Sequence, residues 1–283
     1  RGMGLFVCDE IELSGVPGEM VLRARAAPYA QSKGGKTGLQ TQKSRSWNAG
    51  TTIGGMVKRM AGEHRLTPAV AARLAAIVLP HIDQANESDM NLLHRLARRY
   101  DAIAKPTGGR LVFVPRGEGV TASGQPMPRI TLTPQDGSDY RVMLTRRDGA
   151  GTCVAYYRDT RKAERRAVTV GEGDPVRRLR MAYPDQASAE AAARAELRKR
   201  ARAEGSLFYA FPGRPNVIAE TIVEMAGFRE GVKGDWLITR AEHYLGPGGY
   251  RCTIEGERPN SAEGVAKARG ASVADRVQQG AGE

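Results

Sequence analysis

Glu87 and Asp89 are the two side chains whose type and spacing come closest to an acid–base site. A pair of carboxylates can divide the roles of general acid and general base when their pKa values differ. Both residues, however, follow Asn86 at the predicted start of a helix, where exposed backbone N–H groups favour a capping side chain and negative charge. We therefore predict that Glu87 and Asp89 stabilise a helix terminus and have no catalytic role.

The histidines and cysteines form no pattern that is typical of a metal site or of a nucleophile. No H-E-x-x-H, C-x-x-C or G-x-S-x-G sequence is present, and the histidines lack the spacing of metal ligands. We predict no metal, no cofactor and no catalytic residue, and we expect the cysteines to be buried thiols. The residues concerned are His64, His81, His94, His243, Cys8, Cys153 and Cys252.

The chain is strongly basic, with a formal net charge of +12 and a pI near 9.9. Basic residues outnumber acidic ones between Arg141 and Arg180, and clustered arginines can neutralise phosphates, so a nucleic-acid-binding module is the alternative function. Aromatic residues make up only 6% of the chain and do not interleave with the basic ones, as they would where bases stack. We expect a solvated face or an interface with an acidic neighbour, and no nucleic acid as a specific ligand.

The helix that carries the acidic pair is predicted to end at Tyr100, with apolar residues at helical spacing along one face. Two short strands follow it, at 102–105 and 110–114, joined by a turn that contains Gly108 and Gly109. Some other element must cover the apolar face of the helix. The residues of that face are Leu92, Leu93, Leu96, Ala97 and Tyr100.

Two further helices are predicted upstream of this helix. Thr51 or Thr52 caps the first, whose apolar positions recur at helical spacing through residues 53–61. The dipeptide Thr67-Pro68 predicts the start of the second, which ends at Pro80. An antiparallel strand pair is predicted before them, at 5–13 and 19–27.

The second half of the chain is predicted to be rich in strands. The composition, with 34 Gly and 15 Pro, indicates many turns and favours a β-rich or α+β architecture. One long helix, at 185–204, begins at Asp185 or Ser188 and interrupts an antiparallel sheet or barrel. The predicted strands are 130–133, 140–145, 152–157, 167–171, 176–181, 207–211, 221–226, 236–243 and 250–257.

Two motifs stand near the two ends of the chain's well-patterned part. The first leads into the helix described above, and the second precedes the last strand. The motif residues are Asp83, Gln84, Glu87, Ser88, Asp89, Leu93, Arg95 and Leu96 in the first, and Trp236, Arg240 and His243 in the second. Both motifs resemble those of the late control D proteins of contractile-tailed phages, which are baseplate hub proteins, and the resemblance extends over residues 47–257. The chain is similar, more distantly, to the hub portion of type VI secretion spike proteins.

The resemblance implies a multi-domain α+β fold with β-rich, tube-like barrel modules and a small α/β insert domain. Residues 1–46 would end the first module, 47–116 would form the insert, 117–129 a linker, 130–257 the second module and 258–283 an extended tail. The longest apolar run, at 70–79, is too short to span a membrane.

The implied function is structural and not enzymatic. The resemblance implies a homotrimeric ring that joins a sixfold tail tube to a threefold spike, with the tail tube protein, the spike protein and other baseplate proteins as partners. Such a protein would be made in the host cytoplasm and located in the baseplate of the virion. A hydrolase carried on the tail is a further hypothesis, which no residue supports.

Overall fold

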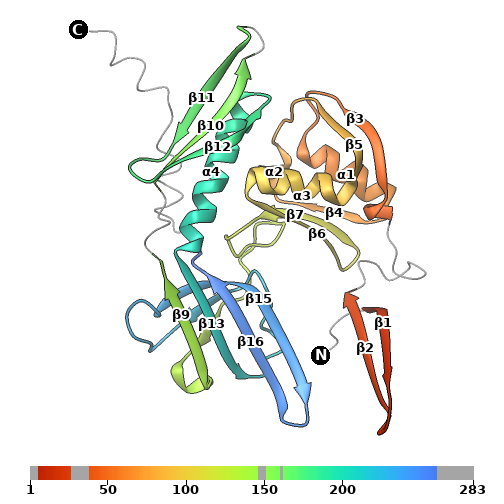
Figure 1. Cartoon of the computed structure of the whole chain (residues 1–283), viewed down its shortest axis with the longest axis vertical. Helices are drawn as coiled ribbons and strands as arrows, with labels where there is room; N and C mark the ends of the chain where they lie inside the picture. The colour runs from red at the N-terminus through yellow and green to blue at the C-terminus, as the bar shows by residue number, and fades with distance from the viewer. Residues whose placement is uncertain (1–5, 27–37, 146–150, 160–161, 260–283) are drawn as a thin grey trace. The chain divides into compact units, whose positions relative to one another are not determined.

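The computed structural model describes residues 6–26, 38–145, 151–159 and 162–259 (Figure 1). The chain divides into two compact units. The first comprises Arg1–Ala97, Ala102–Pro115 and Thr121–Gln125, and the second comprises Arg98–Asp101, Arg116–Val120 and Pro126–Glu283. The fold is multi-domain and of the α+β class, as predicted. The predicted domain boundaries remain a prediction.

The described part of the first unit combines a hairpin, two small sheets and short helices. One sheet pairs β3 with β5, and the other has the strand order β4-β7-β6. The strands are β1 (Phe6–Ser14), β2 (Glu19–Ala26), β3 (Gln42–Trp47), β4 (Thr67–Val70), β5 (Ile82–Ser88), β6 (Ala102–Thr107) and β7 (Arg110–Pro115). The helices are the 3-10 helix η2 (Gly38–Gln40) and the α-helices α1 (Ile53–Glu63), α2 (Ala72–Ala75) and α3 (Asp89–Tyr100).

The core of the first unit is built from the apolar faces that the sequence pattern predicts for α1 and α3. Thr52 caps α1, because its hydroxyl accepts a hydrogen bond from the Gly55 N–H at 3.0 Å. Strand β7 adds Leu111 and Phe113, both fully buried, to this core. The fully buried helix residues are Ile53, Met56, Val57, Met60, Ala61, Leu92, Leu93 and Leu96.

The predicted second helix is wrong over most of its length. Residues Thr67–Val70 form strand β4, which pairs in parallel with β7, and only Ala72–Ala75 are helical. Strand β4 is an edge strand of its sheet, a position that tolerates Pro68 because one side of the strand donates no hydrogen bond to a neighbour. Pairing with β7 therefore outweighs the helix-start signal of Thr67-Pro68.

The start of α3 also differs from the prediction. Strand β5 continues to Ser88, and Asn86 has a positive φ of 47° and hydrogen-bonds the Ser44 hydroxyl instead of capping the helix. The Ser88 hydroxyl takes the capping role, since it accepts from the Asn91 N–H at 3.2 Å.

The hairpin β1–β2 confirms the predicted strand pair and has two different faces. Ile11 and Leu13 of β1 lie opposite Leu22 and Met20 of β2, so the four side chains share one face. Each of them is more than 60% exposed. The hairpin therefore presents an apolar face that the described residues do not cover.

The second unit contains a sheet with the strand order β8-β14-β15-β16-β13-β9. Its core gathers large side chains, among them the fully buried Trp236. The Trp236 indole Nε1 donates to the Val232 carbonyl at 2.7 Å, which satisfies the one polar atom of the ring. The strands are β8 (Ile130–Leu132), β9 (Asp139–Leu144), β13 (Gly205–Pro212), β14 (Ile222–Met225), β15 (Gly234–Gly246) and β16 (Gly249–Glu257), and a 3-10 helix, η3 (Pro134–Asp136), follows β8.

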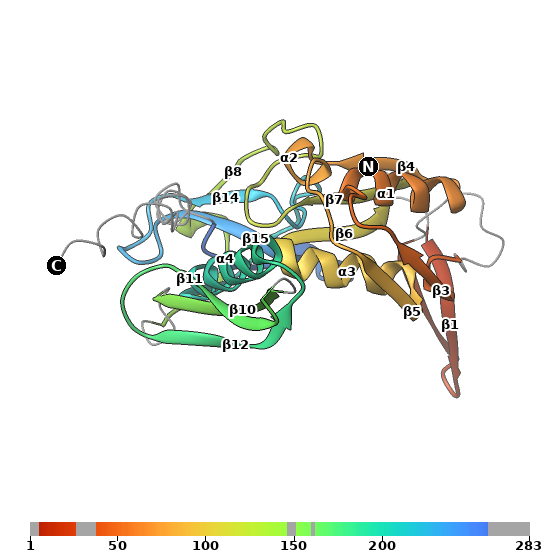
Figure 2. The ribbon, with the colours of Figure 1, turned by 90° about the horizontal axis from the view of Figure 1, so that it is seen from above.

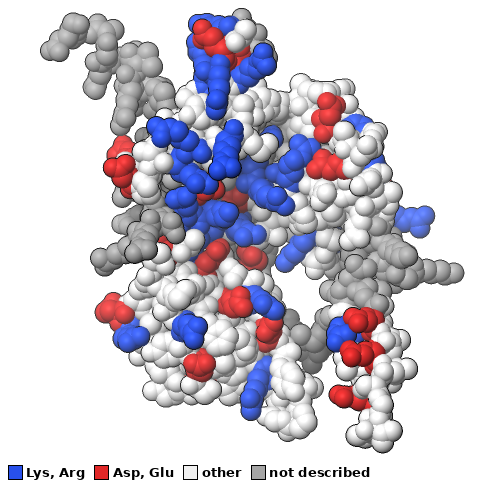
Figure 3. Space-filling view, viewed as in Figure 1, with Lys and Arg blue, Asp and Glu red and all other residues white. Residues whose placement is uncertain are grey.

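The remaining strands of this unit form a separate sheet, β11-β10-β12, with α4 along one face (Figure 2). This corrects the prediction of one antiparallel sheet or barrel, because β12 pairs in parallel with β10. Asp185 caps α4 by accepting from the Ser188 N–H. Lys and Arg side chains gather over this part of the molecule (Figure 3). The elements are β10 (Thr152–Asp159), β11 (Glu164–Val170), β12 (Val176–Tyr183) and α4 (Gln186–Ala203).

The predicted extended tail is described only up to residue 259, so most of it lies outside the described residues. Over the described part of the chain, none of the helices combines the length and the hydropathy that a membrane span requires.

Candidate functional site: an ion cluster around Asp89

Asp89 lies at the first turn of α3, and its side chain is fully buried. Its Oδ1 atom accepts hydrogen bonds from Arg45 Nη2 at 2.7 Å and from Gln84 Nε2 at 2.8 Å. Its Oδ2 atom accepts from Lys43 Nζ at 2.7 Å and lies 2.7 Å from His64 Nε2. Asp89 thus lies in the first turn of the helix, where the sequence pattern placed its charge, but its carboxylate is also the centre of a buried cluster that the sequence did not predict.

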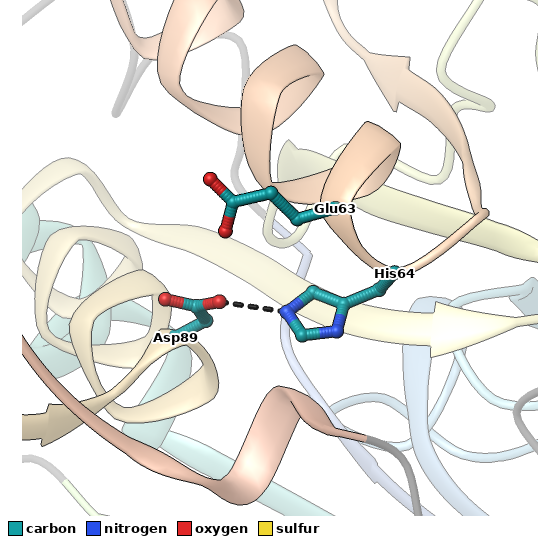
Figure 4. A group of neighbouring side chains, drawn as sticks. All are labelled: Glu63, His64 and Asp89. Carbon is teal, nitrogen blue, oxygen red and sulfur yellow. Dashed lines mark hydrogen bonds and ion pairs between the residues drawn. The ribbon is translucent and has the colours of Figure 1, made fainter.

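Four elements bring the cluster together. Strand β3 supplies Lys43 and Arg45, which are two residues apart and so project from the same face. Gln84 comes from the neighbouring strand β5, and His64 directly follows α1. Figure 4 shows the Glu63, His64 and Asp89 side chains turned toward one another. The cluster therefore ties β3, β5 and the ends of two helices to one carboxylate.

Glu63 is the second carboxylate of the cluster and shares both cations with Asp89. It accepts from Lys43 Nζ at 3.0 Å and from Arg45 Nη1 at 2.6 Å. Gln84 Oε1 accepts from Arg45 Nε at 2.9 Å. All three nitrogen atoms of the Arg45 guanidinium therefore donate hydrogen bonds, to Gln84, Glu63 and Asp89. Two positive and two negative groups balance each other in this arrangement.

The electrostatics favour the charged form of each acid. Burial by itself would raise the pKa of Asp89, but hydrogen bonds from Gln84, His64 and Lys43 and the charge of Arg45 together lower it to about 2. Burial by itself would also raise the pKa of Glu63, but the hydrogen bonds and positive charges of Lys43 and Arg45 lower it. Carboxylates held in this way stay ionised at neutral pH and are poorly suited to proton transfer.

Glu63, His64 and Asp89 have the donor atoms of a possible metal site, since one ligand atom from each lies within 4.8 Å of the others. Lys43 Nζ, however, bonds both carboxylates and lies 3.5 Å from His64 Nε2. An ammonium group is thus placed where a cation would have to bind, and Arg45 supplies a second charge. The donor set fits an internal salt-bridge network, and we propose no metal there.

The other residues of the first motif surround this cluster. Glu87 pairs with Arg95 through two hydrogen bonds of 2.7 and 3.1 Å, and Arg95 Nη2 also donates to the Asp83 carbonyl. The Asp83 carboxylate accepts from the Ser46 hydroxyl at 2.6 Å. Leu93 and Leu96 are fully buried in the adjacent core.

The residues of the second motif lie in the other compact unit and form a separate set of contacts. Arg240 pairs with Glu242 and Glu255 on the surface. The half-buried His243 contacts the Tyr250 hydroxyl at 2.8 Å through Nδ1 and the Val217 carbonyl at 2.9 Å through Nε2. Cys252 Sγ lies 3.1 Å from His243 Nδ1. These partly buried contacts make His243 a polar link between β15, β16 and the Val217 carbonyl.

Sequence reasoning missed Lys43, Arg45, Glu63 and His64 as members of the site. Lys43 and Arg45 alternate along what proves to be β3, which is a signal of a strand with one charged face. Asp89 is 46 residues from Lys43 and 25 from His64 along the chain. Only the fold brings these groups within bonding distance.

Comparison with known proteins shows to which class of proteins this chain belongs. A family model described as the phage tail baseplate hub (GPD) matches residues 35–248. Among solved structures, the tail protein from Neisseria meningitidis MC58 has a TM-score of 0.67 at 11% identity and covers 90% of this chain and 80% of its own. The 43 kDa tail protein of prophage MuSo2 from Shewanella oneidensis has a TM-score of 0.63 at 15% identity, with 89% and 78% covered. Both share the fold of this chain.

Two curated relatives identify the protein family within this class. The probable baseplate hub protein of Escherichia phage P2 is 31% identical over 295 residues, covering 89% of this chain and 74% of the relative. The corresponding protein of Escherichia phage 186 is 32% identical over 296 residues, with the same coverage. The chain belongs to the phage tail baseplate hub family and is a virion structural protein of the tail.

Proposed function

We propose that three copies of this chain form a ring in the baseplate and join the sixfold tail tube to the threefold spike. The observation that carries this proposal is the apolar face of the hairpin β1–β2 (Ile11, Leu13, Met20 and Leu22). An isolated two-stranded hairpin is marginally stable in water, and exposed apolar patches commonly mark interfaces. A neighbouring subunit is the natural cover for this face.

Further surfaces of the second unit support contacts between subunits. Near the end of β15, Tyr244 is 62% exposed and Leu245 is 81% exposed. Strands β8 and β9 are the edges of the large sheet, and an unpaired edge exposes backbone groups that can pair with another chain. A hairpin on one unit and open edges on the other suit a head-to-tail interface, which closes into a ring when the rotation allows.

The ring model assigns a role to each predicted module. The end of the first tube-like module, residues 1–46, would contact the second module, residues 130–257, of the next chain. Three chains would then supply six modules, and the ring would match a sixfold tube on one side and a threefold spike on the other. The partners in this model are the tail tube protein, the spike protein and other baseplate proteins.

The Asp89 cluster has a structural role in this model and no enzymatic one. It fixes β3, the strand that follows the hairpin along the chain, to the core of the first unit through Lys43 and Arg45. A rigid attachment of this kind transmits load between an interface and a folded domain. We place the protein in the tail baseplate of the virion after synthesis in the host cytoplasm.

The hairpin can be tested with matched substitutions. Leu13→Asp places a charge on the apolar face, whereas Val21→Asp places the same charge on the opposite face of the same hairpin. We expect the full-length chain and V21D to have the mass of a trimer by multi-angle light scattering, and L13D to dissociate. An L13D trimer as stable as that of V21D would show that the apolar face does not form the interface.

A further inference from the structure

The sheet β11-β10-β12 has one covered face and one open face. Helix α4 packs on the first, where Cys153 and Ala155 of β10 and Val168 and Val170 of β11 are buried. Side chains alternate along a strand, so the residues between these project from the opposite side, which we call the outer face. The outer face consists of Val154, Tyr156 and Arg158 from β10, Arg165, Ala167 and Thr169 from β11, and Arg178, Arg180 and Ala182 from β12.

Two arginines of the outer face lie directly opposite each other. Arg158 of β10 is in register with Arg165 of β11, and like charges at opposed positions of a sheet repel. The adjacent pair of the ladder, Asp159 and Glu164, is also like-charged, but it projects from the other side of the sheet. There Arg166 Nε lies 3.5 Å from the Asp159 carboxylate and 3.8 Å from that of Glu164. The acidic pair has its counter-charge within the chain, and among the described residues the arginine pair has none.

Strand β12 extends the positive charge of the outer face. Arg178 and Arg180 are both exposed, and no described carboxylate forms an ion pair with either. Arg178 is in register with Val154 and Ala182 with Tyr156, and the register shifts between these pairs, where Arg180 lies. The two arginines border a patch of small and apolar side chains. The nine residues of the outer face include four arginines and no acid.

The pair Arg165 and Tyr156 indicates which class of polyanion fits this surface. The Arg165 guanidinium carbon lies 3.9 Å from the centroid of the Tyr156 ring, which orders the arginine and covers the ring. Bases of single-stranded nucleic acid stack on open aromatic rings, and Tyr156 is the one aromatic residue of the outer face. Arginines around a partly apolar floor are typical of protein interfaces, and the guanidinium fork matches a carboxylate in two hydrogen bonds.

We propose that the outer face docks onto a second protein whose surface presents clustered Asp and Glu side chains. Carboxylates of that partner supply the counter-charge that Arg158 and Arg165 lack. Arg178 and Arg180 contact the edge of the partner surface. The small residues between the arginines allow close approach of the partner backbone. This docking surface is separate from the hairpin β1–β2 and does not depend on the number of chains in the ring.

Binding of labelled poly-L-glutamate to the full-length chain, followed by fluorescence anisotropy at about 50 mM salt, tests the location of the surface. The variants are Arg178→Glu on the outer face and Arg177→Glu, the neighbouring exposed residue that projects from the other side of the strand. Both change the net charge equally. We expect R178E to weaken binding about three- to tenfold and R177E to change it by less than about twofold.

Two results of this measurement would overturn the proposal. Equal weakening by R177E and R178E would mean that poly-L-glutamate follows net charge and that the outer face is not a site. Tighter binding of a DNA duplex than of poly-L-glutamate of the same charge, with the loss again specific to R178E, would assign the face to nucleic acid. Thermal unfolding of each variant confirms that it is folded, and R178Q replaces R178E if the reversal prevents folding.

The assembled tail offers a direct test of the partner's chemistry. Arg178→Lys retains the charge and introduces an amine, which a carbodiimide joins to a carboxylate in direct contact. We expect mass spectrometry of R178K tails to find position 178 linked to an Asp or Glu of another protein chain, and R177K tails to lack a link at position 177. Tails that contain R178K without such a link would contradict the proposal.

Discussion

Lys43 Nζ lies 2.7 Å from the Oδ2 atom of Asp89, a carboxylate that is fully buried although it belongs to the first turn of a helix. The same ammonium bonds Glu63, and Arg45 bonds both acids. One buried carboxylate therefore organises two cations, an amide and an imidazole from β3, β5 and the end of α1.

Replacing Asp89 by Asn should destabilise the first unit by about 2–4 kcal/mol, because Lys43 and Arg45 lose the buried one of the two carboxylates that they share and keep only Glu63. Urea unfolding of the full-length chain measures this difference. Glu10→Gln, which removes an exposed charge from the hairpin, is the control and should change stability by less than about 0.5 kcal/mol. Equal stability of D89N and wild type would mean that the cluster contributes nothing to folding.

The pKa of Asp89 predicts a definite pH dependence. Its value is lowered from 3.8 to about 2, so the carboxylate stabilises the fold fully above pH 4 and loses this contribution as the pH falls toward 2. The contribution is about 2 kcal/mol. The stability difference between wild type and D89N should therefore shrink between pH 4 and pH 2. A difference that stays constant over this range would contradict a lowered pKa.

Leu96→Ala should lower the free energy of unfolding by about 2–5 kcal/mol, through lost burial and a residual cavity. Leu96 is fully buried on the face of α3 that the sequence pattern predicted. Arg98→Ala, on the exposed side of the same helix, is the control for helix propensity. Chemical denaturation compares the two variants. A loss below about 1 kcal/mol for L96A would mean that this face does not belong to the core.

The second unit has its own buried ion pair. Arg202 Nη1 and Nη2 donate to the two Asp101 oxygens at 2.8 and 2.6 Å, and both side chains are almost fully buried. Asp101→Asn should cost about 3–5 kcal/mol, because the buried guanidinium loses the carboxylate that accepts two of its hydrogen bonds and keeps only Glu257, whose Oε1 lies 3.0 Å from Arg202 Nε. The double variant D101L/R202M should recover much of this loss. If the double variant is less stable than D101N in urea unfolding, the pair has a further role that an apolar replacement cannot fill.

The sequence correctly predicted those helices and strands that are determined by the pattern of neighbouring residues. The faces of α1 and α3 follow from apolar residues at helical spacing, and the strand pair at the start follows from alternation around a turn that contains Gly15, Pro17 and Gly18. The helix predicted from Thr67 failed because pairing with β7, more than forty residues away, decides the structure there. Local propensity is a weak guide wherever a tertiary contact of this kind competes with it.

The candidate site was predicted only in part, for the same reason. The first motif named Asp89, Gln84 and Glu87, but the charge pattern assigned Asp89 only to the first turn of a helix and did not predict its buried partners. Arg202 likewise lies in the last turn of a helix, where positive charge is favoured by the helix dipole, and the structure buries it against Asp101. In both cases the partner is distant in sequence, and nothing local indicates that the charge is buried.

Image averaging of the purified full-length chain tests the central proposal most directly. The ring model predicts closed rings of three chains. In these rings two kinds of module alternate and give the rim a nearly sixfold outline. Monomers or dimers at concentrations where the tail assembles, or threefold rings without this alternation, would contradict the proposed junction between tube and spike.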